Sequence, residues 1–100
     1  MGRGAAREAA EQSHVFAIWG MPMKVTRYFK HMMQRPDRAE IAAEEIEAAL
    51  NNPLRTEVQS DGRIRKWAYI AHKMRYLRVV LLDDGETVHN AFYDRDFKES

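Results

Sequence analysis

The sequence predicts an α+β fold in which two helices precede an antiparallel sheet. Two stretches in the first half place apolar residues at helical spacing. The second half alternates apolar and polar residues in segments separated by Asp-Gly pairs, which are typical of hairpin turns. Helices that come before a run of strands indicate an α+β domain with the helices packed on one face of the sheet. The length of 100 residues favours one such domain.

Residues 1–22 are expected to form an N-terminal extension, and residues 23–100 a single domain. The leading stretch "GRGAAREAAEQ" is rich in alanine, and a helix so short and so poor in large apolar residues would be weak. The apolar run "VFAIW" favours docking, because exposed apolar surface is costly in water. The extension is therefore either a flexible leader or a docking helix, and "WGMPM" interrupts any helix before the domain begins.

The first helix of the domain is expected over residues 27–35, with Thr26 as its N-cap. Phe29 and the methionine pair after it recur at spacings of three and four, so they are expected to face the core. Pro36 ends this helix, because a proline disfavours the helical conformation of the residue before it.

The second helix is expected over residues 39–50. Asp37 and Glu40 have the spacing of a capping box at its start. Ile46 and Leu50 belong to its apolar stripe, and glutamates occupy the exposed side. The stretch "NNP" then ends the helix.

Four strands are expected in the second half, joined by two Asp-Gly turns and by "HKMR". Their expected ranges are 54–59, 63–71, 76–82 and 87–93. The run "VVLL" in the third strand indicates a central position covered on both faces. Residues 24–27 are either a fifth strand at the edge or the lead into the first helix. The prediction is therefore a four-stranded or five-stranded antiparallel sheet.

Composition excludes several classes of function. The chain has no cysteine, which excludes disulfides and thiolate chemistry and fits a reducing, cytoplasmic location. Its four histidines lack the spacing of a zinc site, and no Gly-rich loop suggests a nucleotide site, so no metal and no cofactor are expected. No apolar run approaches the roughly 20 residues that span a bilayer, so no membrane association is expected.

Charge is segregated along the chain although the net charge is only +1. Residues 54–78 carry seven Lys or Arg side chains against two acids, while residues 39–53 carry four glutamates and no base. Such blocks can focus a local field on an anionic partner. Solvated faces that pair with one another explain the pattern equally well.

Alternation along residues 63–71 places basic and aromatic side chains on one face of a strand. These side chains are Arg63, Arg65, Trp67 and Tyr69, whereas Lys66 falls on the apolar face. Arginines beside exposed rings suit RNA, because guanidinium groups hold phosphates and rings stack on bases. The alternative is that Trp67 and Tyr69 belong to the core and that the arginines are solvated neighbours.

His31 and Arg35 lie four residues apart, so they share one side of the first helix. A histidine there can act as a general acid or base while the arginine holds a phosphate. An ordinary exposed helix face gives the same spacing. His89, in the last strand, is as consistent with packing as with catalysis.

Five stretches in order resemble a family known as domain of unknown function 4258. They are "MKVTRYFKHMMQR", "AEIAAEEIEAALNNP", "DGRIRKWAYI", "RYLRVVLLDDG" and "VHNAFYDR", and the match covers about residues 23–96. The shared outline is a helix with His and Arg four residues apart, an acidic helix, a "DGR" hairpin and a last strand ending in an aromatic residue followed by Asp-Arg. This family is grouped with RelE/ParE-type toxins, so the resemblance implies a RelE-like fold and RNA as a substrate.

The resemblance implies a small toxin-like RNA-binding protein that acts as a metal-independent endoribonuclease. In that reaction a 2′-hydroxyl of the RNA attacks the adjacent phosphate. The residues expected to act in catalysis are His31, Arg35 and Arg78. Those expected to hold the nucleic acid are Arg63, Arg65, Lys66, Tyr69, Arg75 and Tyr93. The expected partners are RNA and an antitoxin-like protein.

The alternative is a non-catalytic module that binds a protein or a nucleic acid. The nuclease hypothesis depends on one expectation about the fold. Positive side chains of the first helix and of the later hairpin must gather around a shared anion-binding hollow.

Overall fold

A six-stranded sheet runs through the part of the chain that the computed structural model describes, residues 13–18 and 21–99. Its strands are β1 (Ser13–Ile18), β2 (Met21–Thr26), β3 (Arg55–Val58), β4 (Ile64–Ile70), β5 (Arg75–Leu81) and β6 (Val88–Tyr93). The helices of the described residues are α2 (Arg27–Met32), α3 (Pro36–Ala39), α4 (Ala43–Asn51) and the 3-10 helix η1 (Ala71–Lys73). The predicted α+β class is confirmed.

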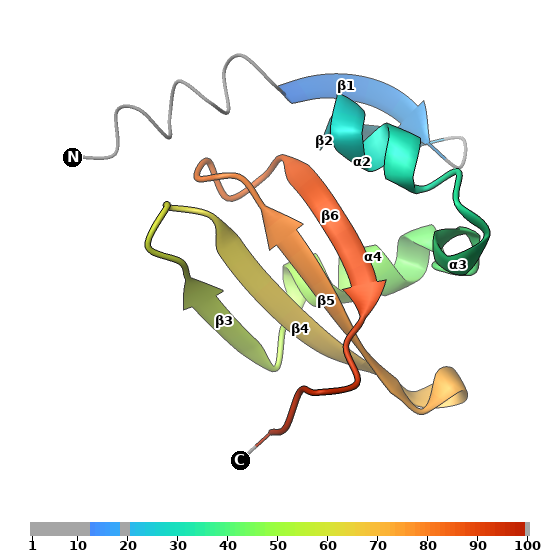
Figure 1. The fold of residues 1–100 in the computed structure, drawn as a ribbon, viewed down its shortest axis with the longest axis vertical. Helices are drawn as coiled ribbons and strands as arrows, with labels where there is room; N and C mark the ends of the chain where they lie inside the picture. The colour runs from blue at the N-terminus through green and yellow to red at the C-terminus, as the bar shows by residue number, and fades with distance from the viewer. Residues whose placement is uncertain (1–12, 19–20, 100) are drawn as a thin grey trace.

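The strands lie side by side in the order β1-β2-β6-β5-β4-β3 (Figure 1). Strands β3 to β6 form the predicted antiparallel meander. Strand β2 runs parallel to β6, with Val25 opposite Val88, so the sheet is mixed and the prediction of a wholly antiparallel sheet is wrong.

The predicted number of strands is too small because β1 and β2 form an antiparallel hairpin that begins inside the N-terminal extension. A short apolar run such as "VFAI" does not distinguish a strand from a helix by its spacing. The extension therefore docks through strand pairing. The weak helix expected from "GRGAAREAAEQ" falls within residues 1–12, outside the described residues.

Helix α2 begins where predicted but ends early. The Thr26 hydroxyl oxygen accepts a hydrogen bond from the Phe29 backbone N–H at 3.0 Å, which confirms the N-cap. Phe29 is fully buried, as its spacing predicts. The helix ends at Met32 because the chain must leave the helical conformation before Pro36, and Arg35 is extended with ψ 142°.

The second predicted helix is divided into α3 and α4. Pro36 occupies the first turn of α3, where its missing N–H costs no helical hydrogen bond. Asp37 lies inside α3, and Ala42 precedes α4 without a side-chain cap, so the predicted capping box is wrong.

Helix α4 covers the back of β4 and β5 (Figure 1). Ile46 and Ala49 of the helix are fully buried there, together with Leu77, Val79 and Leu81 of β5. This aliphatic layer is the main core of the domain.

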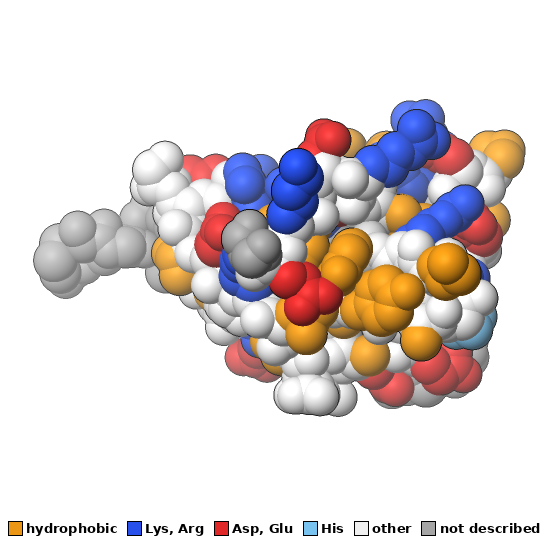
Figure 2. Space-filling model, turned by 90° about the horizontal axis from the view of Figure 1, so that it is seen from below, with side chains coloured by type: hydrophobic (Ala, Val, Ile, Leu, Met, Phe, Trp, Pro, Cys, Tyr) orange, Lys and Arg blue, Asp and Glu red, His pale blue; other side chains and the backbone are white. Residues whose placement is uncertain are grey.

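The opposite face of β4, β5 and β6 carries rings and arginines, and we call it the front face. Its side chains are Arg65, Trp67, Tyr69, Tyr76, Arg78, Asn90 and Phe92, which the strand register places together. Within the described part of the chain, no helix covers β4 and β5 there; instead the C-terminal segment returns, and the Phe97 ring stacks on Trp67 with centroids 5.0 Å apart. Figure 2 looks at the molecule from below the view of Figure 1, so the front side of Figure 1 lies at the top. Apolar side chains gather near the middle of this view, and Lys and Arg side chains lie along the top.

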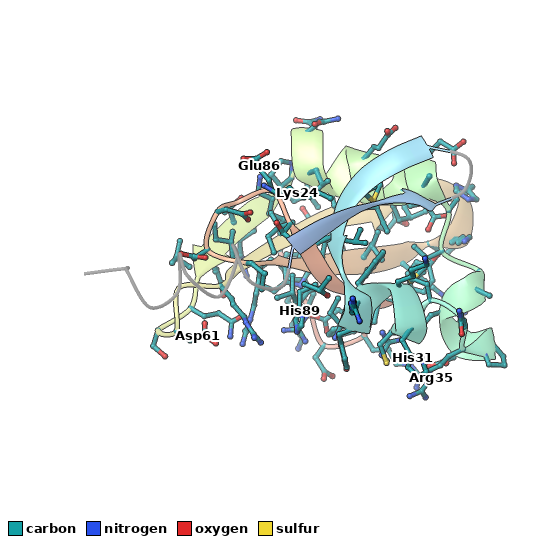
Figure 3. All side chains as sticks on the ribbon, turned by 90° about the horizontal axis from the view of Figure 1, so that it is seen from above. Lys24, His31, Arg35, Asp61, Glu86 and His89 are labelled. Atoms are coloured by element: carbon teal, nitrogen blue, oxygen red, sulfur yellow. The ribbon has the colours of Figure 1, made fainter. Side chains whose placement is uncertain are left out.

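Helix α2 lies on the front side of the sheet, beside β6 and β2, and α4 lies on the back (Figure 1, Figure 3). We expected both helices on one face, and this expectation is wrong. Strand β2 pairs with β6 at Val25 and Val88 only, so the rest of that edge of β6 has no partner strand among the described residues. The segment that joins α2 to α4 passes this edge from the front of the sheet to the back (Figure 1).

Candidate nucleic-acid interface

Arg78 lies at the centre of the front face between two rings. Its guanidinium carbon is 4.5 Å from the centroid of Phe92 and 5.8 Å from that of Trp67. Its Nε lies 3.4 Å from Asp94 Oδ2, and the same oxygen accepts a hydrogen bond from Trp67 Nε1 at 2.9 Å. The Arg78 side chain keeps 22% of its surface exposed. Arg78 is therefore a half-buried, ion-paired cation and also a support for the rings around it.

Arg38, from α3, reaches the other part of the same face. Its guanidinium donates to Asn90 Oδ1 at 2.8 Å and to the backbone oxygen of Ala91 at 3.1 Å. It also lies 5.5 Å from the Phe92 centroid. Arg38 and Arg78 thus share one aromatic neighbour although 40 positions separate them in the chain.

An open hollow of about 670 Å³ lies where β5 begins and β6 ends. Arginines from three separate segments line it, and they are Arg38, Arg75 and Arg95. The acids of its wall are Asp37, Glu40 and Asp94, and its rings are Tyr76, Phe92, Tyr93 and Phe97. The hollow therefore combines balanced charge with aromatic surface.

Two of its arginines are paired with an acid and one is not. Arg75 donates to Glu40 at 3.1 Å, and Arg38 lies 3.6 Å from Asp37. Arg95 is exposed and makes no ion pair with any of the residues that the structure describes. Arg95 is thus the cation of the hollow that is most available to an anion.

Behind the hollow, Tyr93 belongs to a partly buried polar cluster that includes Glu45 of α4. Its hydroxyl donates to Glu45, whose side chain is 5% exposed, and it accepts from Lys73 Nζ at 2.7 Å. Burial raises the pKa of Tyr93, and the hydrogen bond to the Glu45 carboxylate raises it further. Burial alone would lower the pKa of Lys73, but its hydrogen bonds to Glu45 and Tyr93 outweigh this and raise it. Tyr93 is therefore a neutral phenol at ordinary pH and is held in place by the cluster.

The predicted binding residues of β4 lie on two different faces. Arg65 is half-buried on the front face, and Tyr69 is 45% exposed with its ring 5.0 Å from that of Tyr76. Lys66 points to the back, as alternation predicts, and its Nζ donates to the Leu50 backbone oxygen at 3.3 Å. It thereby satisfies a carbonyl in the last turn of α4, where a cation is favourable. Lys66 does not share a surface with Arg65.

His31 lies in the last turn of α2, and Arg35 lies near it beyond the end of the helix (Figure 3), so the prediction that one helix carries both is wrong. His31 is exposed, and within the described residues its side chain makes no hydrogen bond, ion pair or ring contact. Arg35 Nε donates to Asp37 Oδ1 at 3.1 Å. Burial would raise the pKa of Asp37, but the hydrogen bond and charge of Arg35 hold it below its ordinary value. Arg35 thus meets the rim of the hollow through Asp37.

The structure does not gather all the predicted residues around one hollow. Arg63 follows the turn of the β3–β4 hairpin, where its backbone N–H donates to Asp61 Oδ1 at 2.9 Å. Figure 3 places Asp61 at the opposite end of the molecule from His31 and Arg35. The helix and the hairpin tip are therefore too far apart to form one site, whereas Arg75, Arg78 and Tyr93 lie in or beside the hollow.

His89 is part of the packing between α2 and β6. Its Nδ1 lies 3.0 Å from the Thr26 hydroxyl oxygen, and its ring stacks on Tyr28 with centroids 4.9 Å apart. These contacts favour the packing interpretation of His89 over a catalytic one.

Sequence reasoning missed Arg38, Arg95 and Phe92. Alternation in the last strand could have identified Phe92, because it stands between two residues of the opposite face. Spacing within one element does not place Arg38 and Arg95 at the hollow, since only the tertiary fold brings their segments together.

Among the described residues, no three His, Asp or Glu side chains are grouped so that they could hold a metal ion. None of the helices in that part of the chain is long and apolar enough to cross a membrane. Comparisons with known protein families, with curated proteins and with solved structures found no match for this chain.

Proposed function

We propose that this chain is a small RNA-binding protein of the toxin type, with a RelE-like fold, and that it holds single-stranded RNA in and beside the hollow. One observation carries the proposal: arginines from three separate segments line a hollow that also exposes aromatic rings. Guanidinium groups hold phosphates and rings stack on bases, which is how sequence-tolerant single-strand sites work. The order of helices followed by an antiparallel meander agrees with the outline that the family resemblance implies.

The acids around the hollow determine how tightly we expect it to bind RNA. Arg38 and Arg75 each have an acidic neighbour, so a phosphate must compete with Asp37 and Glu40 for them. Arg95 and the exposed Tyr69 offer contacts without that competition. We therefore expect modest affinity with a shallow salt dependence, because the slope of log affinity against log salt is proportional to the number of phosphates neutralised, and that number is small here.

Fluorescence anisotropy with a labelled single-stranded RNA of about 12 nucleotides tests this proposal, since single-strand sites cover roughly 4–16 nucleotides. Arg95→Ala and Arg75→Ala should each weaken binding by about tenfold, and each should reduce the slope of log affinity against log salt by about one. Arg63→Ala is the matched control, because Arg63 lies at the far end of the molecule.

Unchanged affinity for Arg63→Ala is the expected control result. If the wild-type protein does not bind RNA at low salt, or if Arg63→Ala weakens binding as much as Arg95→Ala does, the hollow is not the RNA site.

Cleavage of the bound RNA is a second candidate function. It is favoured by the link from Arg35 through Asp37 to the wall of the hollow, with the exposed His31 beside Arg35. In the proposed reaction His31 would take the proton of the 2′-hydroxyl as its oxygen bonds to phosphorus, the P–O5′ bond would break, and the departing 5′-oxygen would take a proton from water. Arg35 and Arg78 would stabilise the negative charge that grows on the phosphate.

Incubation of RNA with purified protein in the presence of a chelator tests the cleavage reaction. Products ending in a 2′,3′-cyclic phosphate, lost in His31→Ala, are the expected result. Intact RNA together with retained binding identifies the non-catalytic module instead, and an antitoxin-like partner would then be sought by co-purification.

A further inference from the structure

Strand β3 is an open edge of the sheet. It pairs with β4 on one side, and no strand of the described residues pairs with its other side. Val58 is 70% exposed and Leu54, just before the strand, is 51% exposed. Natural edge strands are normally protected by charges or by a covering element, so two large apolar side chains at an open edge indicate a docking surface.

The outward backbone groups of β3 are ready to pair. The Gln59 N–H donates to the Arg63 backbone oxygen at 2.7 Å. Hydrogen-bonded and non-bonded pairs alternate along an antiparallel ladder. Glu57 and Arg55, two and four positions before Gln59, therefore bond toward β4. The N–H and C=O of Thr56 and Val58 point away from the sheet, to where another strand can bond to them.

The sequence of this edge is complementary to itself in one antiparallel register. With Thr56 on a two-fold axis, Arg55 of one copy lies opposite Glu57 of the other, and the same pair recurs on the other side of the axis. The register also places Leu54 opposite Val58, so the two exposed apolar side chains cover one another. Within one copy, Arg55 and Glu57 are only loosely paired at 3.9 Å, and Arg55 also donates to the Glu99 backbone oxygen at 3.0 Å, so pairing with a second copy would replace exposed contacts of Arg55.

We propose that two copies of this chain associate through antiparallel pairing of their β3 strands, with Thr56 at the two-fold axis. The resulting sheet is continuous across both copies, and the interface is isologous. The pairing strand has four residues, so the buried area is small and the dimer is weak and dependent on concentration. The proposal does not depend on RNA binding, because the hollow lies at the beginning of β5 and not at this edge.

Cross-linking through Thr56→Cys tests the register directly, because the natural chain has no cysteine. Opposed residues of a bonded antiparallel pair have Cα atoms about 5.5 Å apart, within the range that a disulfide spans. Ser60→Cys is the matched control: it is exposed on the same hairpin, but its two copies would lie about 26 Å apart at roughly 3.3 Å per residue. Oxidation, or a short bifunctional thiol reagent, should link Thr56→Cys at least tenfold faster than Ser60→Cys.

Reversing the charge at Arg55 or at Glu57 tests whether the partner is a second copy of this chain. Sedimentation should show wild-type protein shifting from one chain mass toward twice that mass as concentration rises. Arg55→Glu alone and Glu57→Arg alone should each remain at one chain mass, because like charges then face one another across the axis. An equal mixture of the two variants should recover the heavier species, since every pair across the axis is again of opposite charge.

Recovery in the mixture also excludes misfolding of the single variants as the cause of their loss. A wild-type chain that stays at one mass at every concentration overturns the proposal. A dimer that forms while Thr56→Cys and Ser60→Cys cross-link equally overturns it as well, because the copies would then meet through another surface.

Discussion

The two faces of the sheet are built in different ways, although alternating residues of the same strands supply both. On the back, Leu77, Val79 and Leu81 are fully buried under α4, and the layer is almost wholly aliphatic. On the front, Arg78 and Trp67 are covered by rings and by the C-terminal segment instead of a helix. The back face is made to exclude water, whereas the front face keeps cations close to water. The front face is therefore the surface on which we propose that RNA binds.

Polar groups on the two faces follow the same division. On the back, the buried Glu45 carboxylate accepts a hydrogen bond from Tyr93 and pairs with Lys73, so its charge is balanced within the fold. At the front, Arg95 remains exposed and Arg78 keeps part of its side chain accessible. If this division is correct, substitutions on the back should cost folding stability, and substitutions on the front should cost binding with a smaller loss of stability.

The largest effect is expected from Ile46→Ala on the back face. Ile46 is fully buried in the core cluster, so its loss removes apolar contacts and leaves a cavity. The free energy of unfolding should fall by about 2–5 kcal/mol, measured by urea denaturation. Glu47→Ala is the control, because this neighbouring side chain is exposed, and it should change stability by less than about 0.5 kcal/mol. A loss for Ile46→Ala that does not exceed the control value would show that α4 is not a stabilising cover.

Phe97→Ala measures how much the aromatic cover of the front face contributes to the free energy of unfolding. The Phe97 ring is 9% exposed, stacks on Trp67 and lies 4.9 Å from the Tyr76 centroid. Its removal should lower the free energy of unfolding by about 1.5–3 kcal/mol, because one aromatic side chain loses its burial. The exposed neighbour Lys98 provides the control, Lys98→Ala. A loss larger than that of Ile46→Ala would reverse the comparison and make the front face the main core.

The meander of the fold was predictable because its signals are local. Asp61-Gly62 and Asp84-Gly85 mark two of its turns, and both glycines adopt positive φ, at 92° and 70°, which favours glycine. Alternation between these turns fixed the faces of β4 correctly, including the position of Lys66. The position of β2 was not predictable in this way, because its parallel contact with β6 joins Val25 to Val88, two residues far apart in the chain that no single turn connects.

The candidate site was predictable only in part, for the same reason. Arg75, Arg78 and Tyr93 belong to strands whose register is local, and they lie in or beside the hollow. Arg38 and Arg95 come from segments outside the sheet. Their approach depends on where the chain turns after α3 and after β6, which spacing within one element does not encode.

Alkaline pH should weaken the back-face cluster. Tyr93 and Lys73 both have raised pKa values in the fold, from ordinary values of 10.0 and 10.5. A raised folded pKa means that the stabilisation is complete below the unfolded value and is lost as pH rises through the folded value. The urea midpoint should therefore fall above about pH 10.

Tyr93→Phe separates this cluster from general alkaline destabilisation. The variant should lose about 1 kcal/mol at neutral pH, from the hydrogen bond to Glu45, and should show a shallower alkaline decline. Tyr69→Phe is the control, because no hydrogen bond of its hydroxyl is present within the described residues. Equal alkaline slopes for wild type and Tyr93→Phe would mean that the cluster does not contribute.

The smallest effect on stability, and the clearest division between the faces, is expected from Tyr69→Ala. Tyr69 is 45% exposed on the front face, so the free energy of unfolding should change by less than about 0.5 kcal/mol. Its ring lies beside Tyr76 at the edge of the hollow, and a base stacked there should be worth about 1–3 kcal/mol of RNA affinity, which anisotropy measures. Tyr28→Ala is a control of matched exposure, at 46%, on α2 against His89. Equal RNA affinities of the Tyr69→Ala and Tyr28→Ala variants would show that Tyr69 contributes no more to RNA binding than an equally exposed ring on α2. The front face would then not be the binding surface.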